Sequence, residues 1–210
     1  MQNIIIVGAG NFGRELCCWL EDMLDHASMR IGGFLDDTRD CAPVLNADYP
    51  YPLLGAIDSY RLHDDDVFVI AIAEPAAKSR IAMALQQRGA AFFTMVHPTA
   101  LLARTARLGA GVVICPFALV SADSLVGDFV TINSYSSIGH DAIIGGGSTL
   151  SCHVDITGGV SIGEGVFFGS GARVLPQLHI GDNAKVGAGA VVMRKVEAGA
   201  TVYAMPAKKL

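Results

Sequence analysis

The feature that most constrains the fold is a large apolar residue that recurs every six positions between Leu108 and Val192. The series is Leu108, Ile114, Val120, Val126, Ile132, Ile138, Ile144, Leu150, Ile156, Ile162, Phe168, Val174, Ile180, Val186 and Val192. The residues two positions before these are small or β-branched, with Leu178 as the exception. Because side chains alternate between the faces of a strand, two inward residues spaced by two indicate a short strand.

Glycine directly follows many of these apolar residues. The glycines are Gly109, Gly127, Gly139, Gly145, Gly163, Gly169, Gly181 and Gly187. We interpret them as tight corners that need unusual dihedral angles. Three hexads then make an 18-residue triangular coil, and about five coils stack between Leu108 and Glu197 at the strand spacing of ~4.8 Å. A β-sandwich has no reason to keep so strict a period, so the repeat predicts a parallel β-helix.

The first half of the chain has a different pattern, in which apolar strands alternate with helical stretches. A buried strand is expected at Ile4–Val7, with a helix after it through Arg14–Leu20. Further strands are expected at 31–37, 67–73 and 91–96, and a helix at 75–88. This order predicts a compact α/β domain with a parallel sheet.

A glycine-rich turn, Gly8-Ala9-Gly10-Asn11-Phe12-Gly13, lies between the first strand and the first helix. Such a turn cradles phosphate in dinucleotide-binding folds, and Asp36 ends the second strand where an acidic residue binds a ribose. Only about 95 residues are available, so a nucleotide-sugar phosphate or base fits the size better than a dinucleotide. The alternative interpretation is a turn that needs its glycines and holds no ligand.

Composition excludes several classes of protein. The net charge of -5 argues against nucleic acid as a partner, since phosphate backbones are held by clustered Lys and Arg. Five cysteines without C-x-x-C spacing predict neither a disulfide framework nor a zinc site. No apolar run reaches the ~18 residues of a spanning helix, and the sequence begins without a leader pattern, so we expect a cytoplasmic protein.

The two halves, a His97-Pro98 junction and the closing Met205-Pro206-Ala207-Lys208-Lys209 together resemble the sugar acyltransferases of the NeuD/PglD type over the whole chain. The resemblance implies a Rossmann-like domain over 1–96 and a left-handed parallel β-helix over 97–210. It also implies a homotrimer with acetyl-CoA in a groove between neighbouring β-helices. The expected acceptor is a 4-amino-4-deoxy sugar on a nucleotide, or a sialic acid hydroxyl.

The catalytic signature of that family is a His followed by Glu or Asp on one corner, and His140-Asp141 matches it. His140 lies two residues past the inward Ile138, so its ring is expected to point outward. An imidazole suits an amine that must lose a proton as it attacks a thioester, because imidazole titrates near neutral pH. Asp141 would raise the basicity of His140 or hold its tautomer, although Asp reaches less far than Glu.

Acetyl-CoA is expected to meet a second group of residues. Gly158 follows His140 by 18 residues, so stacking places the two side by side, with room for the acetyl group and a backbone N–H for the oxyanion. The other predicted coenzyme contacts are Thr149, Pro176, Arg194 and Lys195, with Lys208 and Lys209 adding charge near the phosphates. Thr149 replaces a second His of some family members, and His153 is either its substitute across a subunit interface or a surface His.

The acceptor is predicted to contact the glycine-rich turn and one residue of the β-helix. These residues are Gly8, Gly10, Asn11, Gly13, Asp36, Asp37 and Asn133. Because the phosphate-type turn is retained, we favour N-acetylation of a nucleotide-linked amino sugar over O-acetylation of sialic acid.

Two other classes of function are alternatives for this sequence. A zinc carbonic anhydrase shares the β-helix but needs three His on matching corners, and the spacings of His140, His153 and His179 fit poorly, so no metal is expected. A non-catalytic sugar-binding scaffold is the remaining alternative, since a fold does not imply an activity.

Overall fold

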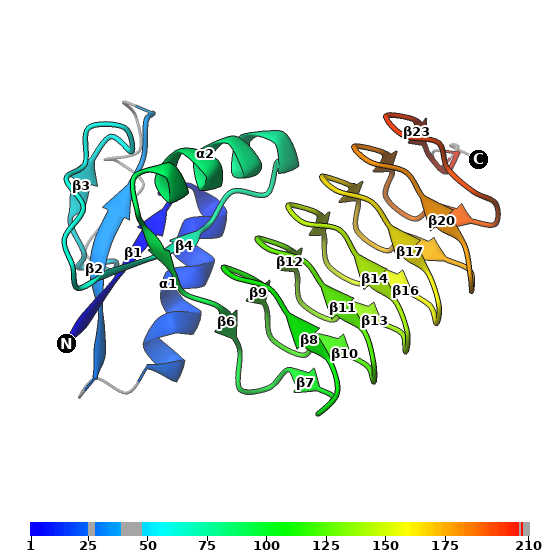
Figure 1. Ribbon diagram of the computed structural model, residues 1–210, viewed down its shortest axis with the longest axis horizontal. Helices are drawn as coiled ribbons and strands as arrows, with labels where there is room; N and C mark the ends of the chain where they lie inside the picture. The colour runs from blue at the N-terminus through cyan, green and yellow to red at the C-terminus, as the bar shows by residue number, and fades with distance from the viewer. Residues whose placement is uncertain (25–27, 39–47, 206, 208–210) are drawn as a thin grey trace. The chain divides into compact units, whose positions relative to one another are not determined.

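The computed structural model describes residues 1–24, 28–38, 48–205 and 207. The chain divides into two compact units, which are described separately (Figure 1). The first comprises Met1–Ala73 and Ala77–Met95, and the second runs from Val96 onward together with Glu74–Ala76. No helix among the described residues is both long enough and apolar enough to cross a membrane.

The first unit is a five-stranded parallel sheet with two helices. The strands are β1 (Gln2–Val7), β2 (Met29–Leu35), β3 (Leu53–Gly55), β4 (Asp66–Ile70) and β5 (Ala91–Phe92), in the order β3-β2-β1-β4-β5. The helices are α1 (Asn11–Met23) and α2 (Pro75–Gln87). Ile4, Ile5, Ile6 and Val7 are buried in the central strand, which explains their unbroken apolar run.

Two elements of this unit differ from the expectation. The short β3 was not predicted, because three residues at the edge of a sheet carry too little pattern to recognise. The strand expected over 91–96 is two strands: β5 pairs with β4 in the parallel sheet, and β6 (Met95–Val96) belongs to a sheet of the second unit.

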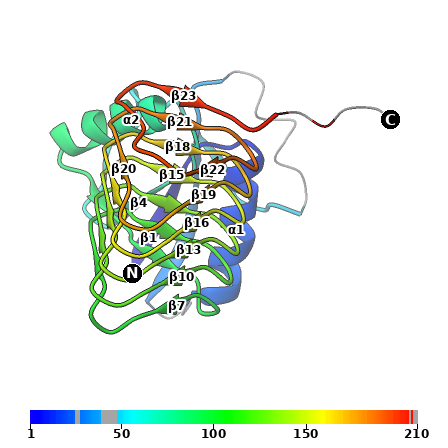
Figure 2. The ribbon, with the colours of Figure 1, turned by 90° about the vertical axis from the view of Figure 1, so that its right-hand side faces the viewer.

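The second unit is the predicted parallel β-helix, with three sheets around an apolar interior (Figure 2). The β12 sheet contains β6, β9 (Val113–Ile114), β12 (Thr131–Ile132), β15 (Thr149–Leu150), β18 (Phe167–Phe168), β21 (Lys185–Val186) and β23 (Thr201–Val202). The β13 sheet contains β7 (Leu101–Leu102), β10 (Leu119–Val120), β13 (Ser137–Ile138), β16 (Asp155–Ile156), β19 (Arg173–Val174) and β22 (Val191–Val192). The β14 sheet contains β8 (Arg107–Leu108), β11 (Leu125–Val126), β14 (Ile143–Ile144), β17 (Ser161–Ile162) and β20 (His179–Ile180).

The hexad positions line the interior as predicted. Residues such as Ile138, Ile156 and Val174 are fully buried, and strands pair in register with partners 18 residues away, as Ile138 does with Ile156. The repeat begins earlier than Leu108, with β6 and β7. It shortens at its end, where Ile180 bridges Val196 instead of a residue 18 positions on.

The corners overturn our explanation of the glycines. Left-handed backbone occurs at the third position after every inward residue from Leu108 to Val186, as at Tyr135 (φ 61°) and Asp141 (φ 57°), and not at the first position. The glycines of the first position are needed because a side chain there would strike the next coil. A Cβ on Gly139 would lie 2.5 Å from the backbone nitrogen of Gly158, and one on Gly127 would lie 2.7 Å from that of Gly146.

Candidate active site

Three columns of corners run along the β-helix and are named here by one residue each. The His140 corner links the β13 sheet to the β14 sheet and contains 121–124, 139–142, 157–160 and 175–178. The Asp128 corner links the β14 sheet to the β12 sheet and contains 109–112, 127–130, 145–148, 163–166 and 181–184. The Tyr135 corner links the β12 sheet to the β13 sheet and contains 97–100, 115–118, 133–136, 151–154, 169–172 and 187–190.

His140 and Asp141 form a pair on the exposed His140 corner. The Nδ1 atom of His140 lies 2.7 Å from Oδ2 of Asp141, and the two side chains are 72% and 66% exposed. The backbone of Asp141 is left-handed, a conformation that Asp tolerates better than most residues. With Nδ1–H donating to the carboxylate, Nε2 of the neutral ring is an acceptor that faces outward from this pair.

Gly158 lies directly against the His140 ring. A Cβ built on Gly158 would be 2.5 Å from Nε2 and 2.7 Å from Cε1 of His140. The two coils are joined here by a hydrogen bond from the N–H of Gly159 to the carbonyl oxygen of His140, 2.8 Å long. The stacking that the 18-residue spacing predicted is therefore present, and any side chain at Gly158 would displace the ring.

The N–H of Gly158 donates no hydrogen bond to another described residue. At the equivalent position of the Asp128 corner, the N–H of Glu164 donates to Oδ1 of Asp182, 2.9 Å away. The residue that would cap Gly158 in the same way is Pro176, whose side chain has no acceptor. The backbone amide beside the His140 ring is thus available to an external acceptor.

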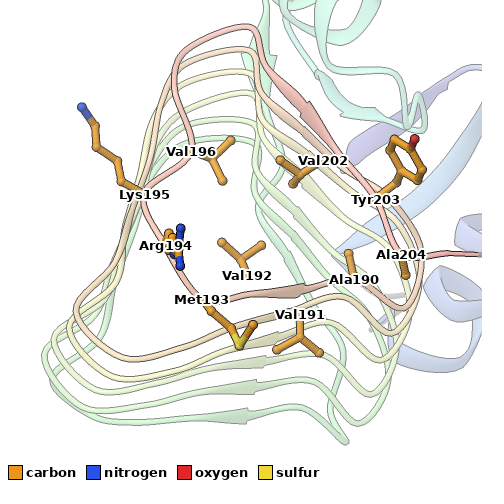
Figure 3. A pocket seen from close by; sticks show the side chains of 10 residues that line it. All are labelled: Ala190, Val191, Val192, Met193, Arg194, Lys195, Val196, Val202, Tyr203 and Ala204. Carbon is orange, nitrogen blue, oxygen red and sulfur yellow. The ribbon is translucent and has the colours of Figure 1, made fainter.

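Arg194 and Lys195 lie on the turn of the last, shortened coil, at the C-terminal end of the β-helix (Figure 3). They line a cavity of about 400 Å³, and Val192, Val196 and Val202 also line it. Lys195 points away from the coil interior and its Nζ lies 3.2 Å from Glu197. Lys208 and Lys209, predicted to add charge here, and most of the closing motif lie outside the described residues.

Thr149, Asn133 and His153 are not beside His140 within one chain. Thr149 is a buried residue of the β12 sheet, whereas His140 lies on the corner between the other two sheets. Asn133 and His153 both lie on the Tyr135 corner, where Oδ1 of Asn133 accepts a hydrogen bond from the N–H of Ser134 at 2.8 Å.

The glycine-rich turn of the first unit contains two glycines that the fold requires and one that it does not. Gly8 has φ +108°, and a Cβ on Gly13 would strike the carbonyl oxygen of Gly8. Gly10 has φ -74°, and a Cβ there would meet nothing within 4 Å. The backbone at Gly10 is therefore open to a close approach from outside, which internal packing does not explain.

Asp36 and Asp37 are engaged by the backbone of their own unit. Oδ2 of Asp36 accepts the N–H of Ala9 at 2.7 Å, and Oδ1 of Asp37 accepts the N–H of Ile57 at 2.8 Å. Partial burial acts to raise the pKa of Asp36, but hydrogen bonds from Thr38 and Ala9 outweigh it and hold that pKa below its ordinary value. Asp36 therefore braces the glycine-rich turn, and Asp37 braces the segment that follows β3.

Sequence reasoning missed a second feature of the β-helix, a stack of aromatic rings on the Tyr135 corner. Phe117, Tyr135 and His153 are 18 residues apart, so the same spacing that paired His140 with Gly158 could have revealed it. Among the described residues, no group of three His, Cys, Asp or Glu side chains is arranged to hold a metal ion.

A parallel sheet with a glycine-rich turn, followed by a hexad β-helix with a His-Asp corner, is similar to the architecture of hexapeptide-repeat transferases. The family model described as PglD N-terminal domain matches residues 3–85, and the model described as bacterial transferase hexapeptide (six repeats) matches residues 159–194. Over these two ranges the chain is similar to the PglD-type sugar acyltransferases.

Several known proteins are similar to it. UDP-N-acetylbacillosamine N-acetyltransferase of Bacillus subtilis is 31% identical over 114 residues, which cover 54% of this chain and 51% of the relative, so the chain matches about half the length of that protein. A crystal structure of a His-to-Asn variant of perosamine N-acetyltransferase from Caulobacter crescentus, in complex with CoA and GDP-perosamine, has a TM-score of 0.86 at 26% identity, covering 99% of this chain and 96% of that one. WeeI from Acinetobacter baumannii has a TM-score of 0.85 at 27% identity, with 100% of both chains covered.

Proposed function

We propose that this protein transfers the acetyl group of acetyl-CoA to the amino group of a nucleotide-linked 4-amino-deoxysugar. The observation that carries the proposal is the His140 ring, which Asp141 holds on one side while the uncapped amide of Gly158 lies on the other. The similar proteins named above as N-acetyltransferases favour an amine over a hydroxyl as the acceptor. The chemistry needed for this transfer is one base, one oxyanion donor and a place for each substrate.

His140 is the general base in this proposal. The neutral amine of the sugar attacks the thioester carbonyl, and Nε2 of His140 takes the proton that the nitrogen loses as the C–N bond forms. Asp141 fixes the tautomer through Nδ1 and stabilises the imidazolium. When the C–S bond breaks, the same proton can pass to the sulfur, so that CoA leaves as a thiol.

Gly158 supplies the oxyanion donor. As the carbonyl carbon becomes tetrahedral, negative charge develops on its oxygen, and a preorganised N–H beside the base stabilises that charge. Because Pro176 offers no acceptor, no competing side chain of the next coil occupies this amide. The contribution of Pro176 to the proposed site is that its side chain has no hydrogen-bond acceptor and leaves the N–H of Gly158 free.

Coenzyme A would extend along the His140 corner toward the C-terminal end of the β-helix. Arg194 and Lys195 are exposed cations at that end and can form charge-assisted hydrogen bonds with its phosphates. Thr149 would have to reach the coenzyme from a neighbouring chain, because within its own chain it lies on the opposite sheet.

A homotrimer would complete the groove. Large apolar side chains flank the His140 corner on both sides: Leu119 of the β13 sheet is 40% exposed, and Leu125 and Ile143 of the β14 sheet are 47% and 48% exposed. Neighbouring exposed apolar side chains of this kind are typical of a surface that another copy covers. Light scattering on the purified protein tests the trimer directly.

The nucleotide sugar is proposed to contact the first unit at the glycine-rich turn. Gly10 and Asn11 offer an open backbone at the start of α1, with Gly8 and Gly13 shaping the turn. Asp36 supports the turn by accepting the N–H of Ala9, and Asp37, next to it in sequence, accepts the N–H of Ile57. Asn133 of the β-helix is proposed to contact the sugar. The reaction is proposed to take place in the cytoplasm.

The test is release of free CoA thiol from acetyl-CoA in the presence of GDP-perosamine, a UDP-linked 4-amino sugar or sialic acid. Turnover with an amino sugar and not with sialic acid is expected. Turnover with sialic acid alone would establish O-acetylation instead. An intact oligomer that binds CoA and releases thiol with none of these acceptors would overturn the proposed reaction.

A further inference from the structure

The Tyr135 corner carries a ladder of three parallel rings on the outside of the β-helix. The ring centroids of Phe117 and Tyr135 are 5.1 Å apart with an interplanar angle of 16°, and those of Tyr135 and His153 are 5.0 Å apart with an angle of 5°. These separations follow the rise of the coils, so each ring is one rung of the same column. Phe117 and Tyr135 are 54% and 55% exposed, and His153 is exposed as well.

The backbone under this ladder is unfavourable for the residues that occupy it. Phe117, Tyr135 and His153 have φ of 59°, 61° and 60°, a region that residues other than glycine rarely adopt and that is least expected of bulky residues such as Phe117 and Tyr135. Ring stacking offsets part of this cost. A flat aromatic column at the surface nevertheless leaves much apolar area in water, which packing of the chain itself does not explain.

The ladder stops where the column loses its side chains. The next two rungs are Gly171 and Gly189, and a Cβ on Gly171 would meet nothing nearer than 3.9 Å, while one on Gly189 would meet nothing within 4 Å. The outer face of the His153 ring therefore borders Gly171, the next position of the column, where no side chain is present. This open position is called the step. The exposed hydroxyl of Ser170 lies next to this step in sequence and can form hydrogen bonds there.

We propose that this step is a binding site for a purine or pyrimidine base, which stacks on His153 as the fourth rung of the ladder. Any nucleobase can stack on an aromatic ring, because every base has a flat π-face. Such stacking needs only a flat ring and open space beside it, and both are present here. The inference rests on the proposed function for the source of the base. The base belongs either to the nucleotide of the acceptor or to the adenine of coenzyme A.

Two variants remove the site in opposite ways. His153→Ala deletes the platform, and Gly171→Asn fills the open rung with a side chain that tolerates left-handed backbone. Each has a matched control. Phe117→Ala shortens the ladder at its other end, and Gly199→Asn makes the same change at a glycine of φ +69° with open space on a different corner.

The measurement is calorimetric binding of CoA, GDP and UDP to the intact oligomer, with its mass checked by light scattering. Both site variants are expected to lower the affinity for one kind of ligand, CoA or a nucleoside diphosphate, by about tenfold. The affinities of both controls should stay within twofold of those of the parent protein. The ligand whose affinity falls identifies the source of the base.

Three results would overturn the inference. Unchanged affinities in both site variants would make the ladder a structural support only. Dissociation of the oligomer in His153→Ala would make it a subunit contact. Equal weakening in the Gly199→Asn control would show a general effect of corner substitutions. Failure of the proposed function is distinguishable from all three, because it appears as the absence of thiol release by the parent protein, whereas these binding measurements need no turnover.

Discussion

The His140 corner and the Asp128 corner are built from the same hexads, yet they treat the same backbone amide differently. On the Asp128 corner, Asp128 caps the N–H of Ala110 at 2.8 Å and Asp182 caps that of Glu164 at 2.9 Å. On the His140 corner, the amide of Gly158 has no such cap. The Asp128 corner uses these two amides to hold coils together, and the His140 corner leaves an amide beside an imidazole, which is the difference between a support and a reactive surface.

Removing the imidazole should have the largest effect on the reactive corner. His140→Ala is expected to lower turnover by about two to four orders of magnitude, because the amine loses its proton acceptor. The exposed side chain holds no core contact, so the oligomer and CoA binding should survive. Steady-state thiol release measures the effect. His179→Ala, a change in β20 of the β14 sheet, is the control. Near-normal turnover of His140→Ala would remove it from the role of base.

Converting the reactive corner into the supporting one should have the next largest effect. Pro176→Asp places a carboxylate where Asp182 lies on the other corner, so it should cap the N–H of Gly158 and place a negative charge near the oxyanion. Loss of one oxyanion donor typically costs about 10²- to 10³-fold in kcat. Pro176→Ala removes the proline without adding an acceptor and should stay within a few-fold of the parent. Equal activity of the two variants would show that the amide of Gly158 does not act in the reaction.

How far the sequence alone could predict these corners depends on the period. The six-residue series identified the buried residues, and the 18-residue spacing placed Gly158 beside His140 before any coordinates. The left-handed third positions were not predicted, because Phe117 and Tyr135 are bulky residue types that rarely adopt that conformation. The short last coil escaped for a similar reason, since the period stops after Val192 and only pairing with Ile180 reveals Val196 as inward.

A methyl group on the reactive corner should have a smaller effect. Gly158→Ala would place Cβ 2.5 Å from Nε2 of His140 and push the ring aside, and we expect turnover to fall by about ten- to a hundredfold. Gly146→Ala is the matched change on the Asp128 corner, where Cβ would lie 3.3 Å from the carbonyl oxygen of Asp128. If both variants lose the same activity, the loss comes from coil packing and not from the position of the ring.

Uncapping the supporting corner should change stability and leave the chemistry alone. Asp182→Ala removes the acceptor of the Glu164 N–H, and we expect the free energy of unfolding to fall by about 1 kcal/mol, the usual net value of one hydrogen bond. Thermal unfolding measures this, and Asp182→Asn, which keeps an acceptor oxygen, should recover most of the loss. Turnover should remain that of the parent protein, because the amides of this corner face no substrate. A loss of activity in Asp182→Ala with normal stability would mean that the two corners do not divide support and catalysis as their hydrogen bonds indicate.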